Sequence, residues 1–182
     1  YETVLKMLQT GTNCPESSGM GRLFDGVAAI LGIRRKAGYE GQGAVLLEAA
    51  ALAGEGGAYP YELCGGEVLT LDWRPTVRAL TSELDGGVEV PVIAARFMNT
   101  LIHAAAEQLA RLAAETGLDR VVLSGGVFQN MYIMDRLPER LRAQGLEVHT
   151  HSRVSANDEG ISLGQLMILE ANYVLGGAAE NS

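Results

Sequence analysis

The sequence reads Val121-Val122-Leu123-Ser124-Gly125-Gly126-Val127-Phe128-Gln129-Asn130 at the start of its last third, and this stretch carries its strongest structural signal. The β-branched beginning has the composition of a buried strand, and the two glycines lead into residues 127–144, which have helical composition. A strand that passes through Gly-Gly into a helix gathers bare backbone N–H groups at a positive dipole end. This arrangement suits a phosphate or another anion, although a plain strand–helix turn is the simpler interpretation of the stretch taken alone.

A second strand and a second helix are predicted after this stretch. Residues 146–150 alternate in polarity as a strand does, and a last helix is expected from Ile161 to about Leu175. The order strand, helix, strand, helix predicts an α/β fold with a sheet covered by helices. If the two strands are parallel neighbours, the loops that follow them lie at one carboxyl edge, where open α/β sheets bind ligands. Pro138 is expected to kink or split the helix predicted over residues 127–144.

The first two thirds of the chain are predicted to be mostly helical. The longest helix is expected from Pro91 to about Glu115, and its apolar stripe between Phe97 and Leu112 indicates the core helix. Residues 59–73 change to a strand-like period around a glycine turn and predict a β-hairpin. Shorter helices are expected over residues 1–10, 22–31, 44–52 and 76–84.

Composition excludes several classes of function. The net charge is −8, and no basic cluster offsets it, so general binding to nucleic acid or to an anionic membrane is not expected. Hydrophobic residues make up 47% of the chain and charged residues 20%, which is typical of a globular domain. No apolar run approaches a membrane span. Two cysteines without a CxxC spacing favour a reduced, cytoplasmic protein. The chain begins with Tyr1, so it is expected to be a piece of a longer polypeptide.

The candidate ligand-binding residues come from separate parts of the sequence: Asp25, Gly41, Gly125, Gly126, Asn130 and Asp158. Asp25 has the chemistry to accept hydrogen bonds from ribose hydroxyls, or it is an exposed helix carboxylate. Asn130 is either a ligand-binding amide or the N-cap of its helix. Asp158 is either a metal ligand or a capping carboxylate.

The chain contains no other group of residues that indicates a defined catalytic or metal-binding chemistry. His149 and His151 form a His-x-His pair that is able to chelate a metal, but two solvated histidines are the simpler interpretation. The chain has no Ser-His-Asp or Cys-His order with a nucleophile turn and no Walker lysine loop. The residues by themselves therefore predict an α/β domain with a nucleotide-like cleft and leave the substrate open.

Three blocks of the sequence resemble the HypF family, the carbamoyltransferases of [NiFe]-hydrogenase maturation. They are MGRLFDGVAA over residues 20–29, LSGGVFQN over 123–130 and NDEGISLGQ over 157–165, and Gly38-Tyr39-Glu40-Gly41 fits the same family. The resemblance runs over essentially the whole chain. It covers only the C-terminal part of HypF proteins, which is the second half of their TsaD-like domain.

This resemblance implies an actin/hexokinase-like (ASKHA) fold. Residues 1–182 would be its C-terminal lobe, with helices around a mixed sheet and a frayed tail over residues 176–182. It also implies a chemistry: HypF proteins make carbamoyl-adenylate from carbamoyl phosphate and ATP. They then transfer the carbamoyl group to the C-terminal cysteine of HypE, for the cyanide ligands of the hydrogenase.

The same resemblance implies roles for the six candidates, while the catalytic residues stay unknown. Asp25 looks like the ribose-binding carboxylate and Gly41 like a backbone contact to the nucleotide. Gly125, Gly126 and Asn130 look like the nucleotide loop, and Asp158 looks like a ligand of the divalent metal (zinc or iron) of the complete domain.

The chain also departs from the HypF pattern in ways that limit what it is expected to do alone. It has no His-x-x-x-His metal pair, no Asp-Gly phosphate loops and no acylphosphatase-like, zinc-finger or YrdC-like domain. We therefore expect the chain alone to be inactive and to bind metal weakly or not at all. The alternative is a non-catalytic docking module for HypE or for the missing N-terminal lobe. A sugar- or acetate-kinase-like protein of the same superfamily would need the missing phosphate loop as well.

Overall fold

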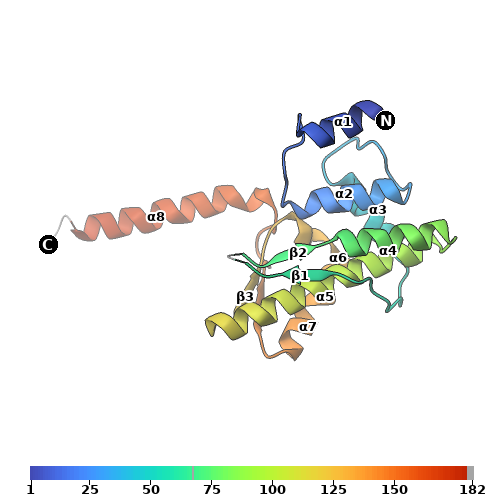
Figure 1. Ribbon diagram of the computed structural model, residues 1–182. Coiled ribbons are helices and arrows are strands. Elements are labelled where there is room, and N and C mark those ends of the chain that lie inside the picture. The colour runs from blue at the N-terminus through green and yellow to red at the C-terminus, as the bar shows by residue number, and fades with distance from the viewer. Residues whose placement is uncertain (67, 180–182) are drawn as a thin grey trace.

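The computed structural model describes residues 1–66 and 68–179, with only the backbone described for residues 174–179. The elements in chain order are α1 (Glu2–Thr10), α2 (Met20–Ile30), α3 (Gln42–Ala50), β1 (Glu62–Cys64), β2 (Thr70–Asp72), α4 (Arg74–Asp85), α5 (Val90–Thr116), β3 (Arg120–Leu123), the 3-10 helix η1 (Gly126–Gln129), α6 (Met131–Met134), α7 (Leu137–Ala143), β4 (Glu147–Thr150), the 3-10 helix η2 (Asp158–Gly160) and α8 (Ile161–Ala179). Figure 1 shows α5 running through the body of the molecule, while α8 projects away from it.

The helix α5 is the core of the fold, as its apolar stripe predicts. Pro91 lies in its first turn, where the missing N–H costs no hydrogen bond. Gly117 ends the helix in the left-handed conformation, with φ at 72°, and its N–H donates to the carbonyl of Ala113. Phe97 is fully buried, but Leu112 is 38% exposed, so the last turns of the helix leave the core.

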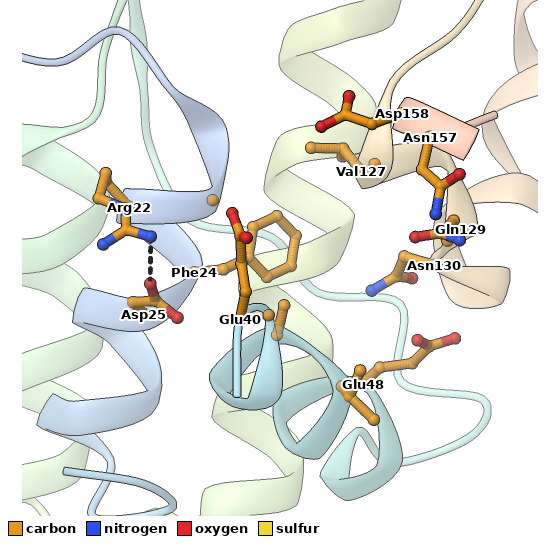
Figure 2. Close-up of a pocket in the computed structure, with 15 residues that line it drawn as sticks. Arg22, Phe24, Asp25, Glu40, Glu48, Val127, Gln129, Asn130, Asn157 and Asp158 are labelled. Carbon is orange, nitrogen blue, oxygen red and sulfur yellow. Dashed lines mark ion pairs between the residues drawn. The ribbon is translucent and has the colours of Figure 1, made fainter. Parts of the chain in front are cut away.

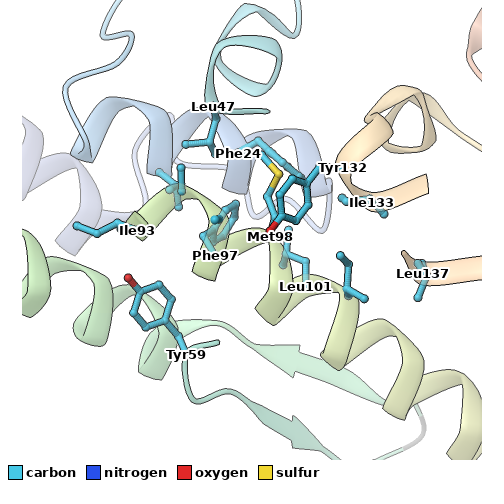
Figure 3. Packing of buried hydrophobic residues seen from close by; sticks show 14 of the residues in the cluster. Phe24, Leu47, Tyr59, Ile93, Phe97, Met98, Leu101, Tyr132, Ile133 and Leu137 are labelled. Atoms are coloured by element: carbon cyan, nitrogen blue, oxygen red, sulfur yellow. The ribbon is translucent and has the colours of Figure 1, made fainter. Parts of the chain in front are cut away.

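The helices α2 and α3 pack against each other, and α3 also packs on α5. The rings of Phe24 on α2 and Phe97 on α5 meet edge to face, with their centroids 5.5 Å apart (Figure 3). Burial of these two rings and of Leu47 from α3 joins the three helices into one hydrophobic core. The core therefore fixes the position of the α2–α3 pair, which carries two of the candidate site residues.

The predicted hairpin is confirmed. The strands β1 and β2 are antiparallel, with Leu63 opposite Leu71. The hairpin is attached to α5 by polar contacts: the Tyr61 hydroxyl donates to Glu107 at 2.7 Å, and the Gln108 amide donates to the carbonyl of Leu69 at 2.9 Å. The helix α4 follows and packs on α5.

The second strand pair confirms the predicted parallel arrangement. The strands β3 and β4 are parallel neighbours, with Val121 opposite Val148. The prediction of a buried strand is wrong for Val122, which is 69% exposed. In the described part of the chain this sheet has two strands, and the exposure of Val122 shows that its side chain is left largely uncovered.

The helix predicted over residues 127–144 is broken into the separate segments η1, α6 and α7. The break before α7 agrees with Pro138, which lies in the first turn of α7. The prediction of one helix directly after Gly126 is wrong, because η1 is a single 3-10 turn that ends at Gln129 and α6 restarts with Asn130 as its N-cap. A side chain that caps a new helix at Asn130 competes with continuation of the first turn.

The fold class is α/β, as predicted, but its strands form two separate two-stranded sheets in the described residues, where one mixed sheet was expected. The helix α8 reaches Ala179. The helix therefore continues past its predicted end near Leu175 and includes residues 176–179 of the tail that was expected to be frayed over residues 176–182. Residues 180–182 lie outside the described residues, so for them the expectation stays a prediction. Among the described helices, none is both long enough and apolar enough to cross a membrane.

Candidate functional site

A cleft of about 530 Å³ brings candidate residues from three distant parts of the chain together. One wall is formed by α2 and the start of α3, and the other by the segments that follow β3 and β4 (Figure 2). Five of the six predicted residues line it, namely Asp25, Gly41, Gly126, Asn130 and Asp158. Gly125 is the chain neighbour of Gly126. The prediction that the loops after two parallel strands share one edge is therefore confirmed.

Asp25 lies on the α2 side of the cleft, and its side chain is 33% exposed. Its carboxylate is 3.3 Å from the guanidinium of Arg22, one turn earlier on the helix. Because Arg22 is largely exposed, this ion pair contributes little to stability and leaves the carboxylate able to accept hydrogen bonds from a ligand. Gly41 is the N-cap of α3 with φ at 79°, a conformation that glycine adopts without strain.

Gly125 shapes the opposite wall. Its φ of 109° and ψ of 164° belong to a region that is essentially restricted to glycine. Its N–H donates to the carbonyl of Ala156 at 2.7 Å, which ties the loop after β3 to the loop after β4. Within the described residues, the N–H groups of Gly126 and Val127 have no hydrogen-bond acceptor. These two donors are the bare backbone groups that the Gly-Gly turn predicts, although the segment behind them is a single 3-10 turn without a long helix dipole.

Asn130 is the N-cap of α6. The side chain is buried, and its Oδ1 atom accepts the N–H of Ile133 at 3.1 Å. Its Nδ2 atom lies 3.9 Å from the sulfur of Met98, which is a weak acceptor. The capping alternative is thus confirmed for the amide oxygen. An amide nitrogen carries two hydrogens, so Asn130 retains a donor for the cleft that it lines.

Glu48 is a cleft residue that was not predicted from the sequence. Its Oε1 atom accepts the N–H of Met131 at 2.7 Å and the N–H of Tyr132 at 3.2 Å. These contacts join α3 to α6 across a separation of 83 residues. A glutamate in an alanine-rich helix gives no local sign of such a contact, so no sequence signal identifies it.

Ser124 and His151 connect the ends of the two parallel strands. The Oγ atom of Ser124 lies 2.9 Å from the Nε2 atom of His151. His149 uses its Nε2 atom in a 3.0 Å contact with Glu147. Each histidine of the His-x-His pair therefore has its own partner, and chelation by the pair gains no support.

The described residues do not make up a metal site around Asp158. Asp158 is exposed at the start of η2, where the neighbouring Asn157 accepts the N–H of Glu159 and so acts as the N-cap. In the described part of the chain, three metal-ligating side chains come together only on the hairpin, at Glu62, Cys64 and Asp72. Asp158 is thus able to offer one oxygen ligand, and one carboxylate alone holds a divalent ion poorly.

Asp72, one of the three side chains in the hairpin cluster, is already engaged in an ion pair with Arg74. Arg74 holds Asp72 through its side chain and its backbone N–H, at distances of 2.7–3.0 Å. These hydrogen bonds lower the pKa of Asp72 to about 2. The carboxylate therefore already has a cationic partner.

Comparison with known proteins identifies the class of this domain. Residues 1–165 match the family described as carbamoyltransferase, Kae1-like domain, second subdomain. The structure superposes on a crystal structure of full-length HypF in its phosphate- and nucleotide-bound form with a TM-score of 0.88 and 38% identity, over 96% of this chain and 23% of that one. The fold is thus that of a Kae1-like α/β domain, as the resemblance implies. The chain belongs to the HypF carbamoyltransferase family.

The relatives are much longer than this chain. The carbamoyltransferase HypF of Synechocystis is 33% identical over 165 residues, which cover 90% of this chain and 21% of that protein. A tRNA N6-adenosine threonylcarbamoyltransferase of Parasynechococcus marenigrum is 29% identical over 164 residues, which cover 82% of this chain and 43% of that protein. The chain therefore spans about a fifth of the length of the Synechocystis HypF protein.

Proposed function

We propose that this chain forms the nucleotide side of a carbamoyl-transfer site and works as the C-terminal lobe of a HypF-type domain. The observation that carries the proposal is the cleft itself, which joins the Asp25 carboxylate to the backbone donors of Gly126 and Val127. A nucleotide presents ribose hydroxyls and phosphate oxygens, so it needs an acceptor and a set of donors on facing walls. The HypF crystal structure with bound phosphate and nucleotide adds support from a relative.

Each residue has a defined part in this proposal. Asp25 accepts hydrogen bonds from the ribose, and the N–H groups of Gly126 and Val127 donate to phosphate oxygens. Gly41 and Gly126 allow the ligand to approach the backbone, because no Cβ stands in the way. Asn130 donates its free amide hydrogen to the ligand. Asp158 would supply one oxygen to the metal of the complete domain.

The proposed reaction first converts carbamoyl phosphate, water and ATP to carbamoyl-adenylate, phosphate and pyrophosphate. It then forms a thiocarbamate on the C-terminal cysteine of HypE. In the second step the cysteine sulfur bonds to the carbamoyl carbon, AMP leaves with the electrons of the broken C–O bond, and the thiol proton is released. Formation of the adenylate would fall to the YrdC-like domain of a complete protein. The chain alone is therefore expected to be inactive. Both cysteines are free, which is compatible with the proposed cytoplasmic setting.

Titration calorimetry with ATP tests the nucleotide site. We expect weak binding by the wild-type chain and a loss of about tenfold or more in Asp25→Ala, because a charge-assisted hydrogen bond disappears. Asp85→Ala is the matched control, since Asp85 is an exposed carboxylate at the end of α4 and does not line the cleft. Equal affinities of wild type and Asp25→Ala would contradict the assignment of Asp25.

Docking is the second candidate function, and the surface of α8 favours it. Leu166, Ile168 and Leu169 are 62–65% exposed, and Tyr173 is 86% exposed. A helix that exposes this many large apolar side chains is normally covered by another part of the molecule or by a partner. We propose that its partner is the remaining part of a HypF polypeptide, because the chain spans only 23% of the full-length protein on which it superposes.

A binding experiment separates the two candidates. The rest of a HypF protein, supplied as a separate chain, is expected to co-purify with the wild-type chain. The double variant Leu166→Lys/Leu169→Lys should no longer retain it. A pull-down with HypE, with and without ATP, gives the contrast. If the chain captures HypE equally well with and without ATP and binds no ATP itself, the result would favour the non-catalytic docking module.

A further inference from the structure

The N–H groups in the first turn of α6 are capped by two side chains, that of Glu48 from α3 and that of Asn130, the N-cap of α6 itself. The N–H groups of Met131 and Tyr132 donate to Glu48 at 2.7 and 3.2 Å, and the N–H of Ile133 donates to Asn130 at 3.1 Å. The first turn of a helix has no acceptors of its own for these groups. All three donors are therefore satisfied, and none of them remains for a phosphate.

The position of α6 depends on such contacts because the helix is very short. It has four residues, far fewer than a helix needs to be stable by itself in water. The carboxylate of Glu48 makes charge-assisted hydrogen bonds, which are the stronger kind. The Oε1 atom of Glu48 accepts both of the first two N–H groups of α6 and so connects α3 to α6. Figure 2 shows the Glu48 side chain extending from α3 toward the segment that carries Asn130.

Glu48 joins the two walls of the cleft. It belongs to α3, whose N-cap Gly41 lines one wall, and it holds the segment whose N-cap Asn130 lines the other. A movement of Met131 away from Glu48 would also move Asn130, because the two residues are neighbours in the chain. The Glu48 carboxylate therefore links the two walls directly, in addition to the packing of α6 on α5.

We infer that Glu48 is a positioning residue for the nucleotide cleft, and this inference rests on the proposed nucleotide site. Glu48 sets the orientation of Asn130 by anchoring the first turn of α6, and its effect on ligand binding passes through Asn130. The phosphate of the ligand then has the N–H groups of Gly126 and Val127 as its backbone donors, since those of α6 are already bound.

Amide hydrogen exchange tests the anchoring without any ligand. In Glu48→Ala the N–H groups of Met131 and Tyr132 should exchange about tenfold faster or more than in the wild type, because they lose their acceptor. In Glu48→Gln the side-chain carbonyl is still an acceptor, and most of the protection should remain. Amides of α5, such as that of Phe97, report whether the fold as a whole is intact. Unchanged exchange at Met131 and Tyr132 in Glu48→Ala would overturn the inference.

Chemical-shift titration with ATP tests the link to Asn130. Glu48→Ala is expected to bind ATP about tenfold more weakly, and Glu48→Gln to stay within about threefold of the wild type. In the Asn130→Ala background the Glu48→Ala change should have little further effect, since the two residues act as one unit. Glu139→Ala, which removes an exposed carboxylate from the first turn of α7, is the control for loss of charge.

The outcomes distinguish the inference from the function on which it rests. A wild-type chain that shows no ATP binding contradicts the proposed nucleotide site. Binding by the wild type together with additive losses in Glu48→Ala and Asn130→Ala contradicts the positioning role, because independent sites add. A loss of ATP affinity in Glu48→Gln as large as in Glu48→Ala, with the amides of Met131 and Tyr132 still protected from exchange, also contradicts it, because the anchor would be intact and the charge itself would act on the ligand.

Discussion

Gly43 of α3 lies so close to Asp25 of α2 that an added Cβ atom would stand 2.9 Å from the Oδ1 atom of Asp25. The same atom would lie 3.3 Å from the Cβ atom of Ala28. The absence of a side chain at Gly43 therefore permits the close packing of α2 and α3. It also leaves the carboxylate of Asp25 free to lie along the wall of the cleft.

Gly43→Ala is expected to destabilise the chain by about 1–3 kcal/mol, because the new methyl group must push α2 and Asp25 away. Gly26→Ala is the matched control. Gly26 is an exposed interior residue of α2 with nothing within 4 Å of an added Cβ, so alanine should stabilise the helix by about 0.5–1 kcal/mol. Urea unfolding measures both changes. A neutral Gly43→Ala would show that α2 and α3 can separate freely.

Gly125→Ala should cost about 1–3 kcal/mol, since alanine does not adopt the backbone conformation of Gly125 without strain. Gly126→Ala should leave the free energy of unfolding nearly unchanged, because Gly126 has an ordinary φ and an added Cβ meets nothing within 4 Å. Its methyl group would stand at the cleft, however, so ATP affinity should fall. Thermal unfolding and calorimetry together separate the two effects. A large loss of stability in Gly126→Ala would count against this division of roles.

Asn130→Ala removes the side-chain cap of α6 and is expected to lower the free energy of unfolding by about 1 kcal/mol. Asn130→Ser retains an oxygen acceptor at the N-cap and should recover most of the stability. Serine does not supply the amide donor, so it should not recover ATP affinity. Recovery of both by serine would mean that Asn130 acts on the ligand only through the cap.

Protonation of His103 should lower the free energy of unfolding in mild acid. Burial on α5 lowers the pKa of His103, and the positive charge of Arg140 lowers it further. The unfolded chain then binds the proton more readily than the folded chain, so the free energy of unfolding should fall as the pH drops below about 6.5. NMR titration of the imidazole should give a pKa below that value, and Arg140→Gln should raise it. A pKa above the ordinary value in the wild type would contradict this account.

Local signals were sufficient for most of the secondary structure. Pro91 and Gly117 mark the ends of α5 because their backbone preferences act within a few residues. The same holds for the Gly-Gly turn, because the absence of a side chain is what permits the unusual backbone conformation of Gly125. The prediction of one helix over residues 127–144 was wrong, because capping by Asn130 and the ring of Pro138 divide this segment. The hydrophobic pattern of a sequence does not decide between one long helix and several short ones.

Burial was harder to predict than element type. Val122 has the composition of a buried strand but is 69% exposed, because burial depends on what covers the second face of the sheet. The apolar residues of α8 show the same effect. The type of a residue indicates only how often such residues are buried. Whether a particular side chain is buried depends on the surface that packs against it.

The sequence alone was enough to name Asp25, Gly41, Gly126, Asn130 and Asp158, since motif spacing preserves such residues in recognisable blocks. It did not reveal that the carboxylate of Glu48 reaches Met131 at 2.7 Å from 83 residues away. A hydrogen bond between such distant residues exists only after the core around α5 has brought α3 and α6 together. The local sequence was thus enough to name the motif residues, while the tertiary structure decided that Glu48 also lines the cleft and how the walls of the cleft are joined.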